Sequence, residues 1–570
     1  MSLWPIPVAP LVSTPSPTHR MIAIDDRTTI DQAFFEACAR YADRSLLAVP
    51  ANPARGYDPA GREITYREAE AQVRQLMQHY AAAGYGLGHR VALFLESRPE
   101  HLLHKLALNA LGVCCVPINP DYRPRELAYL IDHAQVDLIV LLTARTAVVH
   151  EALALTRHQP PLTLVETWGQ AALPAPARAP QRGEVQGQMQ GQVQGDTPAS
   201  ILYTSGTTGQ PKGCVLSHTY ELAAGHWYAH QGGLGTVREG QERLYNPLPL
   251  FHVNASILSF YCMLLSGGCQ VQTDRFQPSR WWTEVVESRA TIVHYLGVVV
   301  PMLLNQPESP LERAHCVRFG YGAGVEPQLH ARFEARYGFP LLELWGMTEM
   351  VRPLCDCHEP RQVGTRAFGR ARPGLDACVM DEAGQVVPDG TPGELVIRHS
   401  AATPRRHFFS GYLDNPEATA QAWRGGWFHT GDVVMRAADG MFHFMDRRKN
   451  IIRRSGENIA AAEVEALLLT HPLVANAAVM ALPDEMREEE VLACVVLKAG
   501  RSGETADLAR ALFDFCHQQL AYYKAPGWLW FTDEIPTTGT QKIQKHRIFP
   551  EGTDPRQHPA MHDLRALKKR

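Results

Sequence analysis

The chain has 570 residues, enough for more than one domain and for a large core. Apolar residues make up 45% of it and charged residues 20%, a balance typical of a soluble globular protein. The formal charge of −4 argues against a nucleic-acid-binding protein, which usually presents a basic surface. Twelve cysteines without a disulfide-like spacing favour a reducing compartment, and we expect a cytoplasmic protein.

The first 25 residues are expected to form a disordered tail. They hold several prolines and lack the basic and apolar segments of a signal peptide, and translation could start at Met1 or at Met21. No apolar run in the chain is long enough to span a bilayer, so no membrane span is expected.

Two helical patterns come first in the chain, and strand and helix patterns alternate from Val91 onward. Capping-box patterns start at Thr29 and Thr65, and each is followed by apolar residues at helical spacing. Alternation of this kind predicts βαβ units, and hence a parallel sheet covered by helices. The expected strands are 91–95, 113–116, 136–142 and 162–165, and the expected helices are 99–110, 123–133 and one from about 145.

A low-complexity segment at 171–196 interrupts this pattern. It is rich in Pro and Ala and then in Gln and Gly, a composition that buries too little apolar surface to order itself. We expect a surface linker with no function of its own.

A loop rich in glycine and hydroxyl groups follows the linker, between apolar runs that end at Tyr203 and begin at Cys214. Its glycines let backbone amides point inward, its hydroxyls add donors and Lys212 supplies a cation, so the loop is suited to phosphate. It is not a Walker A loop, because Gly206 and Gly209 have the wrong spacing and no helical pattern follows Lys212.

The stretch Tyr203-Thr-Ser-Gly-Thr-Thr-Gly-Gln-Pro-Lys-Gly213 resembles the signature loop of the adenylate-forming superfamily. This superfamily comprises acyl-CoA synthetases, adenylation domains of peptide synthetases and firefly-type luciferases. Further motifs follow in the family's order, among them Leu344-Trp-Gly-Met-Thr-Glu349, Trp427-Phe-His-Thr-Gly-Asp432 and the segment from Phe444 to Ile459. They extend the resemblance from about Arg62 to about Arg547.

The resemblance implies an α/β fold like that of acyl-CoA synthetases. A large N-terminal domain with helix-covered parallel sheets would carry a small, mobile α+β C-terminal lid domain. We place the adenylation domain at 26–446, the lid at 447–550 and a second disordered tail at 551–570.

The resemblance also assigns residues to MgATP. The hydroxyl-rich loop would hold phosphates, Trp345 would stack on adenine where tyrosine is usual, and Asp432 would accept hydrogen bonds from the ribose hydroxyls. Glu349 would bind Mg²⁺, a hard cation that prefers oxygen ligands. The catalytic set implied is Lys542, Thr204, Lys212 and Glu349. The nucleotide set implied is Thr204, Ser205, Gly206, Thr207, Thr208, Gly209, Lys212, Gly322, Ala323, Gly324, Trp345, Gly346, Thr348, Asp432, Arg447, Lys449, Gly456 and Lys542.

The lid residues have distinct implied roles. Lys449 stands at the family's hinge position, and Gly456 belongs to a loop beside the pantetheine tunnel. Lys542 stands at the position of the mobile catalytic lysine, but Gln541 replaces the glycine that usually precedes it. Lys545 lies close by on the same segment, so the sequence leaves open which of the two lysines is catalytic.

The acyl pocket is implied by Asn246-Pro-Leu-Pro-Leu-Phe-His252 and by the later motifs. A core histidine satisfied by backbone remains an open alternative for His252. The chain looks most like crotonobetaine/carnitine-CoA ligases and allied small-acid ligases, while aryl and medium-chain acids stay open. A quaternary ammonium substrate would need an aromatic cage, for which Trp227, Tyr228, Tyr321 and Trp345 are candidates. The pocket residues implied are His252, Asn254, Tyr321, Gly322, Trp345 and Met347.

The implied function is that of an ATP-dependent acyl-CoA ligase. It would convert a carboxylic acid to acyl-AMP with release of pyrophosphate and then transfer the acyl group to CoA, so ATP, Mg²⁺ and CoA are expected. Two alternatives stay open: an enzyme that loads a carrier protein, and a nucleotide-binding homologue with weakened catalysis. A homodimer is left open, and the cluster Cys355-Asp-Cys357-His358 is interpreted as a plain loop rather than a metal site.

Overall fold

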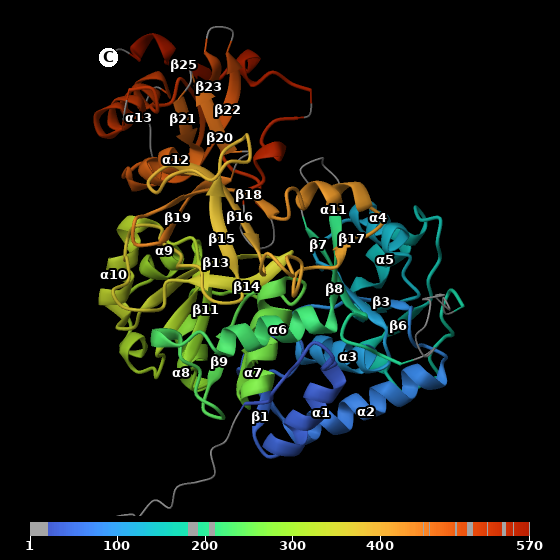
Figure 1. Cartoon of the computed structure of the whole chain (residues 1–570). Helices are drawn as coiled ribbons and strands as arrows, with labels where there is room; N and C mark the ends of the chain where they lie inside the picture. The colour runs from blue at the N-terminus through green and yellow to red at the C-terminus, as the bar shows by residue number, and fades with distance from the viewer. Residues whose placement is uncertain are drawn as a thin grey trace, which may run out of the picture.

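The computed structural model describes residues 21–179, 192–204, 211–447, 450–454, 457–484, 487–498, 505–520, 522–537, 543–550 and 552–568. These residues form a large body and a smaller C-terminal lobe, which lies at one end of the body (Figure 1). The expected fold class, a large α/β domain with a smaller C-terminal domain, is confirmed. None of the described helices is long and apolar enough to cross a bilayer.

The first large sheet is built from the βαβ units that the sequence predicts. Its inner strands are parallel, and two antiparallel strands extend one edge. Val91 and Leu93 belong to one core cluster, and Ala92 and Phe94 to another, because neighbouring side chains of a strand point to opposite faces. The spatial order is β17 (Gly411–Tyr412), β8 (Lys212–Ser217), β7 (Pro198–Thr204), β4 (Cys114–Pro117), β3 (Arg90–Phe94), β5 (Leu138–Leu141) and β6 (Leu162–Leu164).

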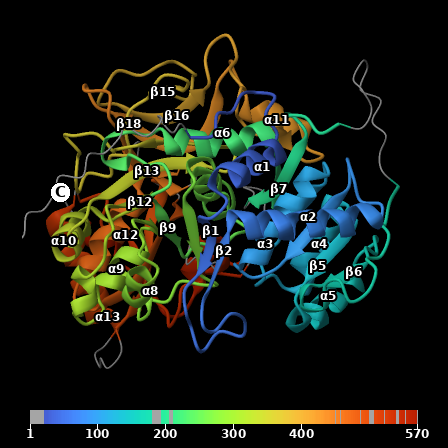
Figure 2. The same cartoon turned by 90° about the horizontal axis from the view of Figure 1, so that it is seen from below.

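Helices cover both faces of this sheet (Figures 1 and 2). Both predicted capping boxes are present, and the Thr65 side chain accepts a hydrogen bond from the Glu68 amide. The helix predicted at 99–110 has those bounds because Pro99 favours a helix start and Gly112, at φ 72°, follows its end. These helices are α1 (Ile30–Tyr41), α2 (Tyr66–Ala82), α3 (Pro99–Ala110), α4 (Pro124–Ala134) and α5 (Thr146–Leu153).

The second large sheet is parallel except at its two edges, β14 and β2. It runs in the order β14 (Met350–Cys355), β13 (Leu341–Met347), β12 (Phe319–Ala323), β11 (Ile292–Leu296), β9 (Arg243–Asn246), β10 (Cys269–Gln272), β1 (Ser45–Val49) and β2 (Arg62–Thr65). One face packs on α8 (Trp281–Glu287), α9 (Val299–Leu304) and α10 (Pro327–Tyr337).

Two buried helices join the two large sheets into one core. They are α6 (His218–Ala229) and α7 (Phe260–Ser266), and a π-helical turn, η4 (Asn254–Ser259), leads into α7. Figure 2 shows α6 crossing from one sheet towards the other. The same core cluster contains residues of both sheets, so the loops at the ends of their strands are held in a fixed relation.

A four-stranded antiparallel sheet and the lid complete the chain. The sheet has the order β15 (Asp376–Met380), β16 (Pro392–Arg398), β18 (Phe428–Arg436) and β19 (Phe442–Arg447), with α11 (Pro416–Ala422) before β18. The lid sheet has the order β21 (Glu457–Ala460), β20 (Ile451–Arg454), β23 (Glu488–Leu497), β24 (Trp528–Phe531) and β25 (Met561–Asp563), and β22 (Val474–Asp484) pairs with β23. Its helices are α12 (Ala461–Thr470) and α13 (Thr505–Gln519).

Three predicted boundaries need correction. Ile22 is buried and its amide donates to the Leu265 carbonyl, so the folded body begins before residue 26. Residues 171–179 of the expected linker pack on the body, because Arg178 binds the fully buried carboxylate of Asp137 through hydrogen bonds of 2.9 and 2.7 Å. Residues 180–191 of that linker lie outside the described part of the chain.

The expected tail at 551–570 is wrong for residues 552–568. This stretch supplies β25, which pairs with β24, and the buried Leu564 of the lid core. The sequence did not predict that this segment is folded. The segment is polar, has no helical or strand pattern of its own, and is anchored by ion pairs to residues that are distant in the sequence.

Candidate active site

The two ends of the hydroxyl-rich loop are brought together by strand pairing. Thr204 is the last residue of β7, Lys212 the first of β8, and the two are paired in the antiparallel register. Residues Ser205, Gly206, Thr207, Thr208 and Gly209 lie outside the described residues. The strands therefore hold the predicted cation beside the predicted hydroxyl at the edge of the first large sheet.

Glu349 lies at the turn between β13 and β14, where Met347 pairs with Met350. Its side chain is buried, and the Tyr412 hydroxyl donates to its Oε1 at 2.8 Å. The neighbouring Thr348 is held by its backbone, whose carbonyl accepts from the Tyr220 hydroxyl at 2.6 Å. An oriented, buried carboxylate of this kind fits the hard cation that the sequence predicts.

Tyr412 is a functional candidate that the sequence reasoning missed. Besides its bond to Glu349, its ring lies 5.0 Å from the Lys212 ammonium, in cation–π range. β17 pairs with β8, which sets Tyr412 opposite Cys214. Burial, and then the charge of Glu349, raise the pKa of Tyr412, so its hydroxyl stays a donor. One side chain thus links the predicted metal ligand to the predicted phosphate-binding cation.

Trp345 and Asp432 are joined directly. The indole Nε1 donates to Asp432 Oδ2 at 2.9 Å, and both residues are buried. Asp432 on β18 pairs with Arg447 on β19, so the two predicted ribose contacts stand opposite one another in the backbone register. The structure therefore brings the predicted adenine- and ribose-binding positions together, with Gly346 next to Trp345 on β13.

The predicted adenine-facing strand end, Gly322 to Gly324, is crowded. A Cβ on Gly322 would come within 2.2 Å of the Tyr295 carbonyl oxygen, and Gly324 has φ +86° and lies against Gly297. Ala323 is the last residue of β12. Glycine is needed here for close backbone approach and for the left-handed conformation.

Glu343 fixes this strand end and was also missed. Its carboxylate accepts from the Gly324 amide at 3.0 Å and from the Tyr295 hydroxyl at 2.7 Å. Burial raises the pKa of Glu343 to about 7, although these donors favour the charged form. The signal in the sequence was weak, because an acidic residue two positions before an aromatic one has many structural explanations.

Predicted pocket residues are connected by a buried polar chain. His294 Nδ1 lies 2.7 Å from Asn254 Oδ1, and His294 Nε2 lies 3.0 Å from the Tyr228 hydroxyl. The Tyr228 ring stacks on that of Tyr321, with centroids 4.1 Å apart. Burial lowers the pKa of His294 to about 3, so this imidazole is neutral. His252 is exposed, and its ring contacts Phe251 rather than lying in the core.

The four candidate cage aromatics do not form a cage. Tyr228 and Tyr321 stack on each other, and Trp345 is engaged with Asp432. The ring of Trp227 already carries the Arg372 guanidinium at 4.2 Å and that of Arg352 at 5.6 Å. Because Tyr228 and Tyr321 stack on each other and the Trp227 ring already carries two guanidinium groups, the expectation of an aromatic cage from these four residues is not supported.

Most of the site residues predicted in the lid lie outside the part of the chain that the structure describes. Lys542, Lys449 and Gly456 lie outside the described residues, and Arg447 is placed only by its backbone position in β19. Lys545 is described: its Nζ donates to the Val479 carbonyl at 2.6 Å and pairs with Glu465 at 2.8 Å. In the described part of the chain, no three His, Cys, Asp or Glu side chains are grouped so that they could hold a metal ion. The cluster from Cys355 to His358 is therefore not such a group.

Family models match both parts of the chain. The model of the AMP-binding enzyme matches residues 34–413, and that of the AMP-binding enzyme C-terminal domain matches residues 463–542. The chain belongs to the AMP-binding enzyme family. This AMP-binding enzyme is 31% identical to a sulfoacetate–CoA ligase from Cupriavidus necator, over 90% of the chain and 95% of the relative. It is 29% identical to a crotonobetaine/carnitine–CoA ligase from Proteus mirabilis, over 85% of the chain and 93% of the relative.

Among solved structures, this AMP-binding enzyme is similar to ATP-bound MatB from Rhodopseudomonas palustris. The two share 26% identity with a TM-score of 0.74, over 91% of this chain and 98% of the other. These matches confirm the expected family and its class of activity, an AMP-forming acid–CoA ligase that uses ATP.

Proposed function

We propose that this AMP-binding enzyme is an acyl-CoA ligase for a short, polar carboxylic acid. The observation that carries the proposal is the cluster of Lys212, Tyr412 and Glu349, which sets a cation and an oriented carboxylate beside the hydroxyl-rich loop. The Trp345–Asp432 pair supplies the matching nucleoside contacts. Together they provide the positioning and charge stabilisation that phosphoryl chemistry requires.

In the first step, a substrate carboxylate oxygen attacks the α-phosphorus of ATP, and the bond to the pyrophosphate oxygen breaks. Lys212 and the loop from Thr204 hold the departing phosphates, while Asp432 accepts from the ribose hydroxyls. Negative charge grows on the phosphate oxygens, and Lys542 is the proposed group that bridges the α-phosphate and the carboxylate. The acid becomes an acyl-AMP with a good leaving group.

Mg²⁺ is the proposed metal, and Glu349 is the residue that would hold it. When bound, a divalent cation neutralises charge on the phosphate oxygens. Tyr412 keeps Glu349 Oε1 oriented through its hydroxyl, and its ring also contacts Lys212. The protein's own contribution is thus a buried carboxylate that Tyr412 orients.

In the second step, the CoA sulfur attacks the acyl carbon and AMP leaves with the electron pair of the broken C–O bond. Lys449 is the proposed hinge about which the lid turns, and Gly456 belongs to the loop that would then face the thiol. Such an exchange of lid positions protects the easily hydrolysed acyl-AMP from water between the two steps.

The proposed substrate class is supported by the polar groups near Tyr321 and by the relatives. Tyr228 and Tyr321 are fully buried, and their rings stack on each other. Asn254 and His294 give the neighbouring wall a polar character. The similar relatives are ligases for sulfoacetate and for crotonobetaine or carnitine, all short polar acids.

A panel of acids tests the proposal. The purified protein is incubated with ATP, Mg²⁺ and CoA, and AMP formation is measured with sulfoacetate, crotonobetaine, benzoate and a medium-chain fatty acid. We expect CoA-dependent AMP release with a short polar acid, and little with the other two. A preference for benzoate or the fatty acid would overturn the substrate class. Acyl transfer to a phosphopantetheinylated carrier protein, without transfer to CoA, would favour the carrier-loading alternative.

A further inference from the structure

The last strand of the lid, β25, belongs to a C-terminal segment that follows the part of the chain matched by the family's C-terminal domain model. That match ends at residue 542. We call residues 552–568 the C-terminal clamp. Its strand β25 pairs with β24 in the antiparallel register, Trp528 opposite Asp563. Leu564 is buried in the lid core, and its amide donates to the Gly527 carbonyl at 2.9 Å. The clamp is therefore part of the folded lid.

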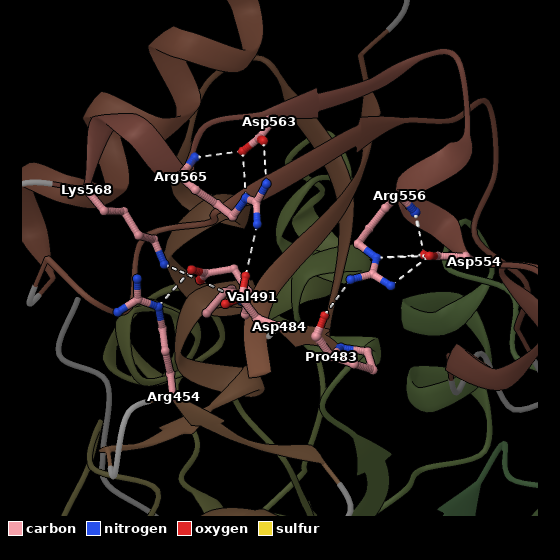
Figure 3. A network of polar contacts seen from close by, with 10 residues as sticks. Arg454, Pro483, Asp484, Val491, Asp554, Arg556, Asp563, Arg565 and Lys568 are labelled. Carbon is pink, nitrogen blue, oxygen red and sulfur yellow. Dashed lines mark hydrogen bonds and ion pairs between the residues drawn. The ribbon is translucent and has the colours of Figure 1, made fainter. Parts of the chain in front are cut away.

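Near its C-terminal end the clamp binds the buried carboxylate of Glu490 on β23, and a residue of β20 binds the same carboxylate. Glu490 is fully buried; Lys568 Nζ donates to its Oε1 at 2.5 Å and Arg454 Nε to its Oε2 at 2.8 Å (Figure 3). Both cations are themselves buried, at 9% and 2% exposure. A Cβ on Gly527 would come within 2.5 Å of the Glu490 carboxyl carbon, so a larger residue there would displace the Glu490 side chain.

Two arginines of the clamp hold the end of the neighbouring strand β22. Arg565 pairs with Asp484 at 3.0 Å and lies over the Trp528 ring at 4.4 Å. Arg556 donates to the Pro483 carbonyl at 3.0 Å, as Figure 3 shows. The clamp thus contacts β22, β23 and β24 at the side of the lid where Arg454 also lies.

Arg454 is the last residue of β20. In the backbone register of the lid sheet it lies opposite Glu457 of β21 and opposite Glu488 of β23. Residues 455 and 456, which join β20 to β21, lie outside the described residues. The buried ion pair with Glu490 therefore fixes one of the two strand ends from which this short connection leaves.

We propose that the C-terminal clamp is a positioning element for acyl transfer to CoA, acting through the Lys568–Glu490–Arg454 cluster on the end of β20. The inference rests on the proposed function, in which the β20–β21 connection faces the thiol. Lys568 touches no substrate in this scheme. It holds Glu490, which in turn holds Arg454, so its effect falls on the second step of the reaction and not on the formation of acyl-AMP.

Among the three charged residues of the cluster, Lys568 is the best position for a substitution that tests the proposal. Without Lys568, Arg454 and Glu490 remain a matched pair, so the lid is expected to stay folded but to lose the link between clamp and β20. Without the Glu490 charge, two buried cations would face each other, and the lid core would be strongly destabilised. Lys568→Met keeps much of the side-chain volume, and Lys568→Arg keeps the charge.

The test separates the two half-reactions. ATP–pyrophosphate exchange with the best acid reports adenylation, and single-turnover transfer from preformed acyl-AMP reports reaction with CoA. We expect Lys568→Met to slow transfer to CoA by about tenfold to a hundredfold, as a misplaced group does, while exchange stays within about twofold of wild type. Lys568→Arg should restore transfer. Arg556→Ala, a clamp variant away from Glu490, is the matched control and should leave both steps unchanged.

A second readout does not depend on the reaction. Hydrogen–deuterium exchange of the full-length protein should be faster at residues 451–460 in Lys568→Met than in wild type or Lys568→Arg, with the body unchanged. Two results for Lys568→Met would overturn the proposal. One is an equal loss of rate in adenylation and in transfer to CoA. The other is an unchanged rate of transfer to CoA together with unchanged deuterium uptake at residues 451–460. Absence of acid-dependent pyrophosphate exchange in the wild type would instead refute the proposed function, and the deuterium result would still decide whether the clamp holds β20.

Discussion

Trp345 donates its indole N–H to the Asp432 carboxylate at 2.9 Å, across a contact between two different sheets. Trp345 belongs to β13 of the eight-stranded sheet and Asp432 to β18 of the four-stranded one. A tyrosine, usual at this position in the family, would place its hydroxyl differently. Here the tryptophan joins the proposed adenine and ribose contacts into one rigid unit, so its replacement should affect nucleotide binding more than chemistry.

Trp345→Phe keeps an aromatic face and removes the N–H donor. The lost hydrogen bond orients Asp432, and a misplaced contact group weakens binding, so we expect the KM for ATP to rise by about tenfold, with a smaller change in kcat. Pyrophosphate exchange at varied ATP measures this. Trp427→Phe is the control, since Trp427 packs on Arg398 at 3.9 Å and not on Asp432. An unchanged KM in Trp345→Phe would show that the hydrogen bond does not contribute to ATP binding.

Glu349 and Tyr412 should respond differently to substitution. Glu349→Gln removes the proposed metal ligand's charge, and we expect adenylation to fall by about a hundredfold or more. Tyr412→Phe keeps the ring over Lys212 and removes only the 2.8 Å hydrogen bond to Glu349. Loss of an orienting partner typically weakens metal affinity about tenfold, so this variant should need more Mg²⁺ for half-maximal rate. A Mg²⁺ dependence equal to that of wild type would argue against the orienting role.

The two C-terminal lysines can be told apart. Lys545 is occupied by the Val479 carbonyl and by Glu465, which suits a structural role in the lid. We expect Lys545→Ala to destabilise the lid by about 1 kcal/mol and to leave pyrophosphate exchange nearly intact. Lys542→Ala should reduce exchange by about a hundredfold or more, since it removes the charge proposed to bridge the α-phosphate and the carboxylate. The opposite pattern would exchange the two assignments.

Local sequence patterns predicted helices such as α3. The residues that sequence reasoning missed are those whose role depends on contacts between distant segments of the chain. α3 and both capping boxes follow from a proline, a glycine and polar caps within a few residues. Tyr412 could not be recognised, because its partner Glu349 lies 63 residues away in the sequence. The clamp was missed for the same reason: Lys568 and Glu490 are 78 residues apart, and the segment between β24 and β25 is polar.

Glu343 should make stability depend on pH. Its pKa is raised by burial from 4.5 to about 7 in the folded protein. Between these values the folded state binds more protons at this carboxyl than the unfolded chain, so this group lowers the free energy of unfolding as pH rises, by about 3 kcal/mol in all. Glu343→Gln should remove this slope. Urea unfolding of both proteins at about pH 5 and about pH 8 measures it, and parallel pH dependences would contradict the shift.

The contact between Arg178 and Asp137 explains why part of a low-complexity segment is ordered. Asp137 is fully buried, and besides the two hydrogen bonds from Arg178 it accepts the Arg90 amide at 2.8 Å. Arg178→Ala leaves this carboxylate buried without a cation, which should lower the free energy of unfolding by about 3 kcal/mol.

Two further variants show whether the charge pair is the cause. Asp137→Asn combined with Arg178→Ala should recover part of the loss, because the uncompensated buried charge is gone. Arg178→Lys should fall between wild type and Arg178→Ala, since an ammonium cannot donate the two parallel bonds of a guanidinium. Urea unfolding gives the energies, and protease cleavage within residues 171–179 reports release of the segment. Resistance to cleavage in Arg178→Ala equal to that of wild type would mean that Tyr85, whose hydroxyl donates to the Pro174 carbonyl at 3.0 Å, is the stronger anchor.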